Sequence, residues 1–128
     1  MEIHIRIGGL VLHKGKLLLL KRSPLTRLCP NLWEAIHGKI HPNESEEQAV
    51  LREVQEETGL SVKIIKKGPV FRGSLQGGDF KITPYLLESD SNKIVLSEEH
   101  TNSIWINPKD YVKYCPEMKP ELTAFNLI

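Results

Sequence analysis

The chain has 128 residues, of which 40% are hydrophobic and 26% charged, and this predicts one domain over residues 1–128 with a buried core. The formal net charge of +1 excludes a bulk electrostatic attraction to nucleic acid or anionic membranes, and no apolar run approaches the roughly 18 residues of a spanning helix. The start lacks a signal-peptide layout, and Cys29 and Cys115 lie far apart without metal-type spacing, so we expect a reduced, cytoplasmic protein.

The first quarter of the chain predicts strands joined by a tight turn. Residues 3–12 alternate and then become continuously apolar, which is typical of a strand entering a buried sheet. Lys14 and Gly15 are the turn signal, and the leucine-rich residues 16–21 are the returning strand. After a loop over residues 24–31, residues 32–37 are predicted to form a short strand.

A helix is predicted between Ser45 and Gly59. Ser45 and Gln48 have the spacing of a capping box, and Glu46 and Glu47 lie where the helix dipole favours negative charge. Gly59 suits the left-handed conformation that ends a helix. An apolar stripe for burial consists of Ala49, Val50 and Val54.

The second half of the chain predicts more strands, followed by helical segments. In the alternating strand over residues 80–86, Pro84 indicates a sheet edge or a bulge. The next expected elements are a strand from residue 62 to 71 or 74, a turn at 76–79, and a short strand or strand-like piece at 94–96. A polar loop at 97–103, a strand at 104–106, a short helix capped by Asn107 and a final helix at 119–126 follow. This order predicts a mixed sheet packed between helices, of the α/β class.

Three glutamates share one face of the predicted helix. Glu53, Glu56 and Glu57 stand at i, i+3 and i+4, which places neighbouring side chains roughly 5–6 Å apart. Like charges at this spacing destabilise an isolated helix, whereas a bound cation such as Mg²⁺ would offset the repulsion. A solvated, Glu-rich surface helix is the alternative interpretation of these glutamates taken alone.

The stretch from Gly38 to Leu60 resembles the Nudix box, G-x5-E-x7-R-E-U-x-E-E-x-G-U, in which U is aliphatic. Gly38, Glu44 and residues 52–60 match every defined position. The resemblance implies an α/β/α sandwich that hydrolyses a nucleoside diphosphate linked to a group X, with Mg²⁺ or sometimes Mn²⁺. Metal ions in such enzymes neutralise phosphate charge and activate water. Glu44 matches a position that supports the loop or the metal site.

The resemblance also assigns roles within the box and next to it. Glu53, Glu56 and Glu57 match metal ligands, and Arg52 matches an orienting arginine. The backbone carbonyl of His37 matches a further metal ligand. His37 departs from the Pro-Gly-Gly of many members, which puts the turn geometry and the substrate in doubt. A substrate-facing or solvent-facing His37 is the main interpretation, and a side chain acting as ligand or base is the minority one.

Other residues outside the box extend the resemblance. Arg22 matches an arginine that contacts substrate phosphate in many MutT-like members, with a solvated arginine at a strand end as the alternative. Glu34, after Trp33, matches a base-facing or supporting carboxylate. Residues 99–105 resemble the family's E-H-x4-W segment, in which a glutamate completes the metal site or acts as general base. Glu99 fits this role best, and Glu98 is the alternate.

Several functions are compatible with this resemblance. The leading hypothesis is a MutT-like nucleoside di- or triphosphate pyrophosphohydrolase, favoured by the small size and by Arg22. A dinucleoside polyphosphate hydrolase fits the E-H-x4-W segment, whereas ADP-ribose hydrolases usually carry extra strands before the first core strand. A non-catalytic Nudix domain that senses a nucleotide or binds RNA would be expected to have a degenerate box. We expect a nucleotide substrate, no specific nucleic acid, no membrane partner, and a monomer or homodimer.

Overall fold

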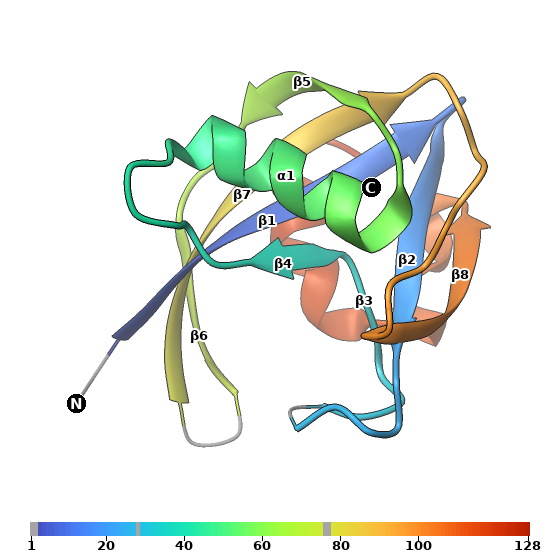
Figure 1. Cartoon of the computed structure of the whole chain (residues 1–128). Coiled ribbons are helices and arrows are strands. Elements are labelled where there is room, and N and C mark those ends of the chain that lie inside the picture. The colour runs from blue at the N-terminus through green and yellow to red at the C-terminus, as the bar shows by residue number, and fades with distance from the viewer. Residues whose placement is uncertain (1–2, 28, 76–77) are drawn as a thin grey trace.

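The protein is a mixed β-sheet covered by helices on both faces (Figure 1). The structure, a computed structural model, describes residues 3–27, 29–75 and 78–128. Helix α1 (Glu46–Thr58) lies on one face, and the C-terminal helix α2 (Lys119–Ala124) lies on the other. The predicted α/β class, with a mixed sheet packed between helices, is confirmed. None of the described helices is long and apolar enough to cross a membrane.

Eight strands and two short 3₁₀ helices complete the described elements. The strands are β1 (Ile3–His13), β2 (Lys16–Arg22), β3 (Trp33–Glu34), β4 (Ile36–Gly38), β5 (Val62–Lys67), β6 (Phe71–Leu75), β7 (Gly78–Ser89) and β8 (His100–Ile106). The 3₁₀ helices are η1 (Pro108–Lys113) and η2 (Pro116–Met118). Asn107 caps η1 as predicted, because its side chain accepts a hydrogen bond from the Lys109 amide.

The pairing of the strands brings distant parts of the chain to one end of β2. The parallel pair of β1 and β7 forms the centre of the sheet, and β1 also pairs with β4 and β2. Strand β2 pairs with β3 and with β8, so that Lys21 faces Trp33 and Arg22 faces His100 across the two ladders. Residues near positions 22, 34, 37 and 100 therefore gather below the C-terminal end of α1.

The run of leucines in β2 is buried on both faces of the sheet. Leu18 and Leu20 join the core under α1, which also contains Val50 and Val54. Leu17 and Leu19 belong to the opposite core, which the C-terminal segment covers with Met118, Leu122 and Phe125. A strand that is buried on both faces has a continuous apolar run rather than an alternating one.

Helix α1 begins and ends as its sequence predicts. The Ser45 side chain accepts from the Gln48 amide, and the Gln48 side chain accepts from the Ser45 amide, completing the capping box. Gly59 ends the helix in the left-handed conformation, with φ of 75°. The side chains of Ala49, Val50 and Val54 are buried against the sheet. The local signals are thus sufficient to position this helix.

Two predictions about the second half of the chain are wrong. Residues 94–96 do not form a strand; instead the Val95 amide donates to the Thr58 carbonyl (2.9 Å) while Ile94 and Leu96 pack against the core under α1. The polar loop predicted over 97–103 is shorter, because β8 already begins at His100 and pairs with β2. Contacts with distant parts of the chain, namely the end of α1 for Val95 and strand β2 for β8, decide these outcomes, and the local sequence does not contain that information.

The central position of β7 also differs from expectation. Pro84 was expected at an edge or a bulge, but β7 is an interior strand with β1 on one side and β5 and β6 on the other. The Pro84 carbonyl accepts from the Gly68 amide (2.8 Å), so the missing proline N–H faces the break between β5 and β6. That break also divides the strand predicted from residue 62. Of the turn predicted at 76–79, residues 76 and 77 lie outside the described residues, and Gly78 already begins β7.

Candidate active site

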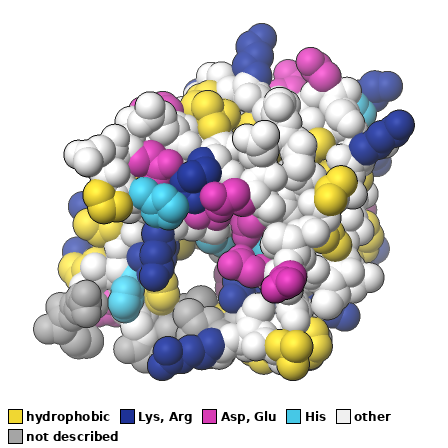
Figure 2. Space-filling model, viewed as in Figure 1, with side chains coloured by type: hydrophobic (Ala, Val, Ile, Leu, Met, Phe, Trp, Pro, Cys, Tyr) yellow, Lys and Arg dark blue, Asp and Glu magenta, His cyan; other side chains and the backbone are white. Residues whose placement is uncertain are grey.

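A pocket of about 330 Å³ lies between the C-terminal half of α1 and the segment before β8. Five glutamates and one serine line it, namely Glu53, Glu56, Glu57, Ser97, Glu98 and Glu99. Figure 2 shows acidic side chains gathered beside a hollow on this face of the molecule. The three glutamates of the helix and the two candidate glutamates of the loop, which are distant in the sequence, therefore share one pocket.

Arg52 fixes one side of the pocket. Its guanidinium donates twice to the Glu44 carboxylate, from Nε at 2.7 Å and from Nη2 at 3.0 Å. Its Nη1 donates to Glu53 (2.9 Å) and to Glu56 (3.2 Å), and its Nη2 donates to the Lys39 carbonyl (2.8 Å). These hydrogen bonds hold the pKa of Glu44 down at about 2. Arg52 thus ties the loop after β4 to the acidic face of α1 and offsets part of the repulsion there.

Gly38 leaves room for Glu53. A side-chain carbon placed at Gly38 would overlap with the carboxyl carbon of Glu53, so any other residue here would force the Glu53 side chain to move from its present position. Burial raises the pKa of Glu53 against the opposing effect of Arg52, and the nearby charges of Glu56 and Glu99 raise it further. The first glycine of the box is explained by this close approach.

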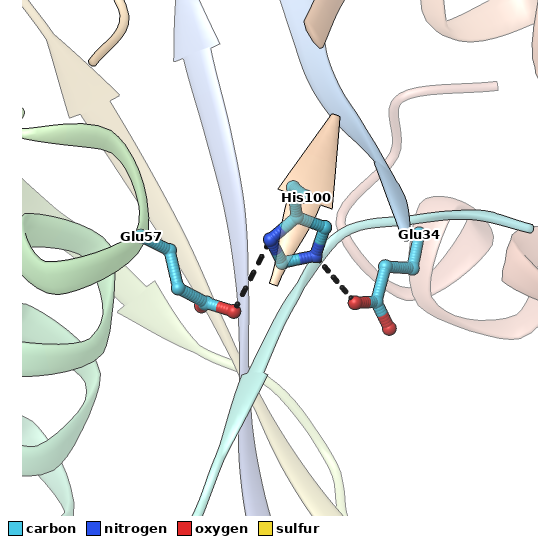
Figure 3. A group of neighbouring side chains, drawn as sticks. All are labelled: Glu34, Glu57 and His100. Atoms are coloured by element: carbon cyan, nitrogen blue, oxygen red, sulfur yellow. Dashed lines mark hydrogen bonds and ion pairs between the residues drawn. The ribbon is translucent and has the colours of Figure 1, made fainter. Parts of the chain in front are cut away.

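Glu57 occupies the buried side of the pocket, next to His100 and Glu34 (Figure 3). The Glu57 side chain is only 5% exposed. Its burial, together with the charges of Glu53, Glu34 and Glu99, raises its pKa to about 9. Glu57 Oε2 and His100 Nδ1 are the two buried side-chain atoms that have no hydrogen-bond partner among the described residues. Without a cation, this carboxyl group is therefore neutral at pH 7.

Glu34 connects the residues predicted outside the box. Its Oε2 accepts from Arg22 Nη1 (2.9 Å) and lies 2.8 Å from His100 Nε2, and its Oε1 lies 3.4 Å from His37 Nδ1. Burial opposes the ionisation of Glu34, but the contacts with His100 and His37 hold its pKa below the usual range. The same carboxylate raises the pKa of His37 although burial opposes this. Arg22, Glu34 and His37 thus form one cluster beside Glu57.

The backbone of Glu99 is fixed by hydrogen bonds, so the residue does not lie in a free loop. The Ser23 amide donates to the Glu99 carbonyl (2.8 Å), and the Glu99 amide donates to Ser97 Oγ (3.3 Å). The negative charge of Glu99 contributes to the raised pKa values of both Glu53 and Glu57. Glu98 and Glu99 both line the pocket, and the charge that acts on Glu53 and Glu57 is that of Glu99.

His100 is the site residue to which sequence reasoning assigned no role. In the sequence, His100 is the histidine of the E-H-x4-W segment, and its position directly after Glu99 is the available signal for a role in the site. In the structure its side chain is fully buried between Glu34 and Glu57. Trp33, by contrast, packs in the core as expected, with its ring at 87° to that of Tyr114.

The donor set of the pocket fits a divalent cation. Glu53, Glu56, Glu57 and Glu99 line the pocket, and Glu57 Oε2 is buried without a partner among the described residues. The described residues whose ligand atoms all lie within 4.8 Å of one another are Glu34, Glu57 and His100. Hard divalent ions take such oxygen ligands, and a cation would remove the mutual repulsion of the glutamates. A helix-borne carboxylate cluster on a mixed sheet defines a candidate metal-dependent hydrolase of the α/β class.

Comparison with known proteins gives the family. The model of the NUDIX domain matches residues 3–125. The CTP pyrophosphohydrolase of Escherichia coli (strain K12) is 27% identical over 121 residues, which cover 93% of this chain and 88% of that protein. An 8-oxo-dGTP diphosphatase of Proteus vulgaris is 38% identical over 61 residues, which cover 48% of this chain and 54% of that protein.

Solved structures agree with this assignment at the level of the fold. The crystal structure of a C. elegans Ap4A hydrolase binary complex superposes with a TM-score of 0.82 at 24% identity, covering 96% of this chain and 95% of that chain. The chain belongs to the NUDIX domain family. It is a Nudix hydrolase with relatives named as pyrophosphohydrolases, and enzymes of this family generally use a divalent metal ion.

Proposed function

We propose that the chain is a Mg²⁺-dependent pyrophosphohydrolase that acts on a nucleoside triphosphate. The observation that carries this proposal is the convergence of Glu53, Glu56, Glu57 and Glu99 on one pocket. A polyphosphate chain carries several negative charges, and so does this pocket. Substrate and protein can therefore approach each other only if cations lie between them.

Each residue of the pocket has a defined task in this proposal. The carboxylates of Glu53, Glu56 and Glu57, with the His37 carbonyl, hold the metal ions, which when bound neutralise phosphate charge and lower the pKa of a bound water. Arg52 keeps Glu53 and Glu56 in place through its hydrogen bonds. Glu99 accepts a proton from the attacking water or serves as a further ligand.

A cluster beside the metal ligands is suited to the substrate phosphates. Arg22 donates from one terminal nitrogen to Glu34, and the planar shape of a guanidinium matches a phosphate group. His37 lies beside the same carboxylate, which raises its pKa and favours its cationic form. These two side chains supply positive charge next to a pocket that is otherwise acidic.

The names of the relatives support a triphosphate as substrate. The chain covers 88% of a protein named for CTP, and it resembles half of one named for 8-oxo-dGTP. Both CTP and 8-oxo-dGTP are nucleoside triphosphates, but their bases differ, so we do not propose a particular base for the substrate. A dinucleoside polyphosphate is the second candidate, because the chain carries the E-H-x4-W segment from Glu99 to Trp105.

A panel of nucleotides tests the proposal. Nucleoside triphosphates, their deoxy forms, Ap4A and ADP-ribose would be incubated with Mg²⁺, with Mn²⁺ and with EDTA, and the products separated by ion-exchange chromatography. We expect a nucleoside monophosphate and pyrophosphate from a triphosphate, and no turnover in EDTA. Preferred cleavage of Ap4A would favour the second candidate, and undiminished turnover in EDTA would contradict both.

A further inference from the structure

The buried group formed by Glu34, His100 and Glu57 contains a carboxylate that is already fully engaged. Both oxygens of Glu34 are in use, since Oε2 contacts Arg22 and His100 and Oε1 contacts His37. A metal ion at Glu34 Oε2 would compete with the Arg22 guanidinium and the His100 imidazole for the same oxygen. Glu34 is therefore suited to hold the other members of the group in place rather than to bind a cation itself.

The contact with Glu34 determines which nitrogen of His100 carries the proton. Glu34 Oε2 accepts from Arg22 Nη1 and lies 2.8 Å from His100 Nε2, so it is an acceptor for the ring as well, and Nε2 carries the hydrogen. In a neutral ring, Nδ1 then presents a lone pair. The ring cannot turn away, because it is completely buried. Its backbone is also fixed, since His100 is the first residue of β8, which pairs with β2. A carboxylate that fixes an imidazole in this manner is the arrangement found behind metal-binding histidines.

The lone pair of His100 points toward Glu57. His100 Nδ1 lies 3.9 Å from Glu57 Oε1, which is too long for a hydrogen bond, and it has no other hydrogen-bond partner among the described residues (Figure 3). Zinc, a representative divalent ion, binds imidazole nitrogen at about 2.0–2.1 Å and carboxylate oxygen at about 2.0–2.2 Å, so two such bonds reach across as much as about 4.3 Å. One ion of this kind can therefore bridge His100 Nδ1 and Glu57 Oε1 across their separation.

We propose that His100 is a nitrogen ligand in the metal site, acting through Nδ1 beside Glu57, with Glu34 as its positioning residue. Mg²⁺ is bound almost entirely by oxygen, whereas imidazole suits first-row transition metals. The site therefore binds Mn²⁺ and Co²⁺ more tightly than an all-carboxylate site would, relative to Mg²⁺. This inference rests on the proposed metal-dependent function and adds a ligand of a different chemical type.

Pulsed electron paramagnetic resonance of bound Mn²⁺ tests the inference directly. The probe is Mn²⁺ added to the whole protein, prepared once with natural-abundance histidine and once with ¹⁵N-histidine. A directly bound imidazole gives a nitrogen modulation that changes with the isotope. We expect this modulation in the wild type. Mn²⁺ that binds and supports turnover without any histidine modulation would overturn the inference and leave the proposed function intact, whereas absence of both binding and turnover would overturn both.

Variants identify the histidine that is responsible. His37→Asn/His41→Asn removes the other histidines near Glu34 and Glu44 and is expected to keep the modulation. His100→Asn is expected to lose it and to weaken Mn²⁺ and Co²⁺ binding by about 10-fold or more, with a smaller change for Mg²⁺. If His100→Asn fails to fold, the His37→Asn/His41→Asn variant still tests the inference. Loss of the histidine modulation in this double variant overturns the inference, and retention of the modulation supports it.

Discussion

Glu56 and Glu57 are neighbours on α1, yet their surroundings are opposite. The Glu56 side chain is 56% exposed and contacts Arg52, whereas the Glu57 side chain is 5% exposed and has an oxygen with no hydrogen-bond partner among the described residues. One part of the acidic face is thus solvated and balanced by an arginine, and the other is buried and kept neutral by its raised pKa. The comparison shows that a run of glutamates in a sequence does not imply one kind of environment.

The largest expected effect tests whether both environments serve the same metal site. We expect Glu57→Gln and Glu56→Gln each to lower kcat by at least about 10²-fold, with the greater loss at Glu57, because each substitution removes an anionic ligand from a site where the metal supplies several kcal/mol. Steady-state kinetics at saturating Mg²⁺ would measure this. Glu47→Gln, at the other end of α1 beside Tyr85, is the matched control and should stay near wild type. Normal turnover in Glu56→Gln would restrict the site to the buried side.

The second effect concerns Glu99, the loop carboxylate that lines the same pocket as Glu56 and Glu57. Glu99→Gln keeps the size of the side chain but removes its charge and basicity. If Glu99 is the general base, kcat falls by roughly 10²–10⁴-fold, while KM changes much less because the ligands on α1 remain. Glu98→Gln is the matched control, and its effect should be mild. A severe loss at Glu98 with near-normal Glu99→Gln would show that the neighbouring residue has this role.

The smallest expected effect is on the free energy of unfolding, and it distinguishes Glu57 from Glu56 most sharply. Because the pKa of Glu57 is raised from 4.5 to about 9, the folded state keeps a proton that the unfolded state has released between these pH values. The contribution of Glu57 to the free energy of unfolding therefore falls as pH rises through this window, by at most about 1.4 kcal/mol per pH unit. Glu57→Gln should flatten the pH dependence of the metal-free protein, and Glu56→Gln should not.

Urea unfolding in EDTA between pH 5 and pH 9 would measure this difference. The shifted pKa of His37 contributes equally to wild type and to Glu56→Gln, whereas loss of the Glu56 charge removes one cause of the raised pKa of Glu53. Comparison of wild type with Glu57→Gln therefore measures the contribution of Glu57. Addition of Mg²⁺ should stabilise the wild type more at high pH, since the metal requires the ionised carboxylate. Identical slopes in all three proteins would mean that Glu57 is ionised at neutral pH without metal.

The features predictable from the sequence are those encoded by short spacings. The capping box of α1, its glycine end and the shared face of Glu53, Glu56 and Glu57 all follow from residues within one helix. The family resemblance of the box also follows from this stretch, and the fold confirms the α/β class that it implied. Local signals suffice here because a helix satisfies its own backbone and sets the relative positions of its side chains.

The features that the sequence did not predict arise from long-range pairing. His100 and Glu34 are 66 positions apart, and they meet because β2 pairs with both β3 and β8. The strand predicted at 94–96 failed for a similar reason, since its backbone bonds to the end of α1 instead of joining the sheet. Sequence periodicity shows which residues are apolar but not which strand lies beside which.

The burial of β2 on both faces has a consequence for how the molecule unfolds. Leu18 and Leu20 contribute to one core and Leu17 and Leu19 to the other, so displacement of this one strand opens both cores together. We therefore expect the two layers of helices to form a single cooperative unit and to unfold in one transition. A cation bound by α1 on one face accordingly protects α2 on the opposite face, because the free energy of binding is added to the unfolding of the whole molecule.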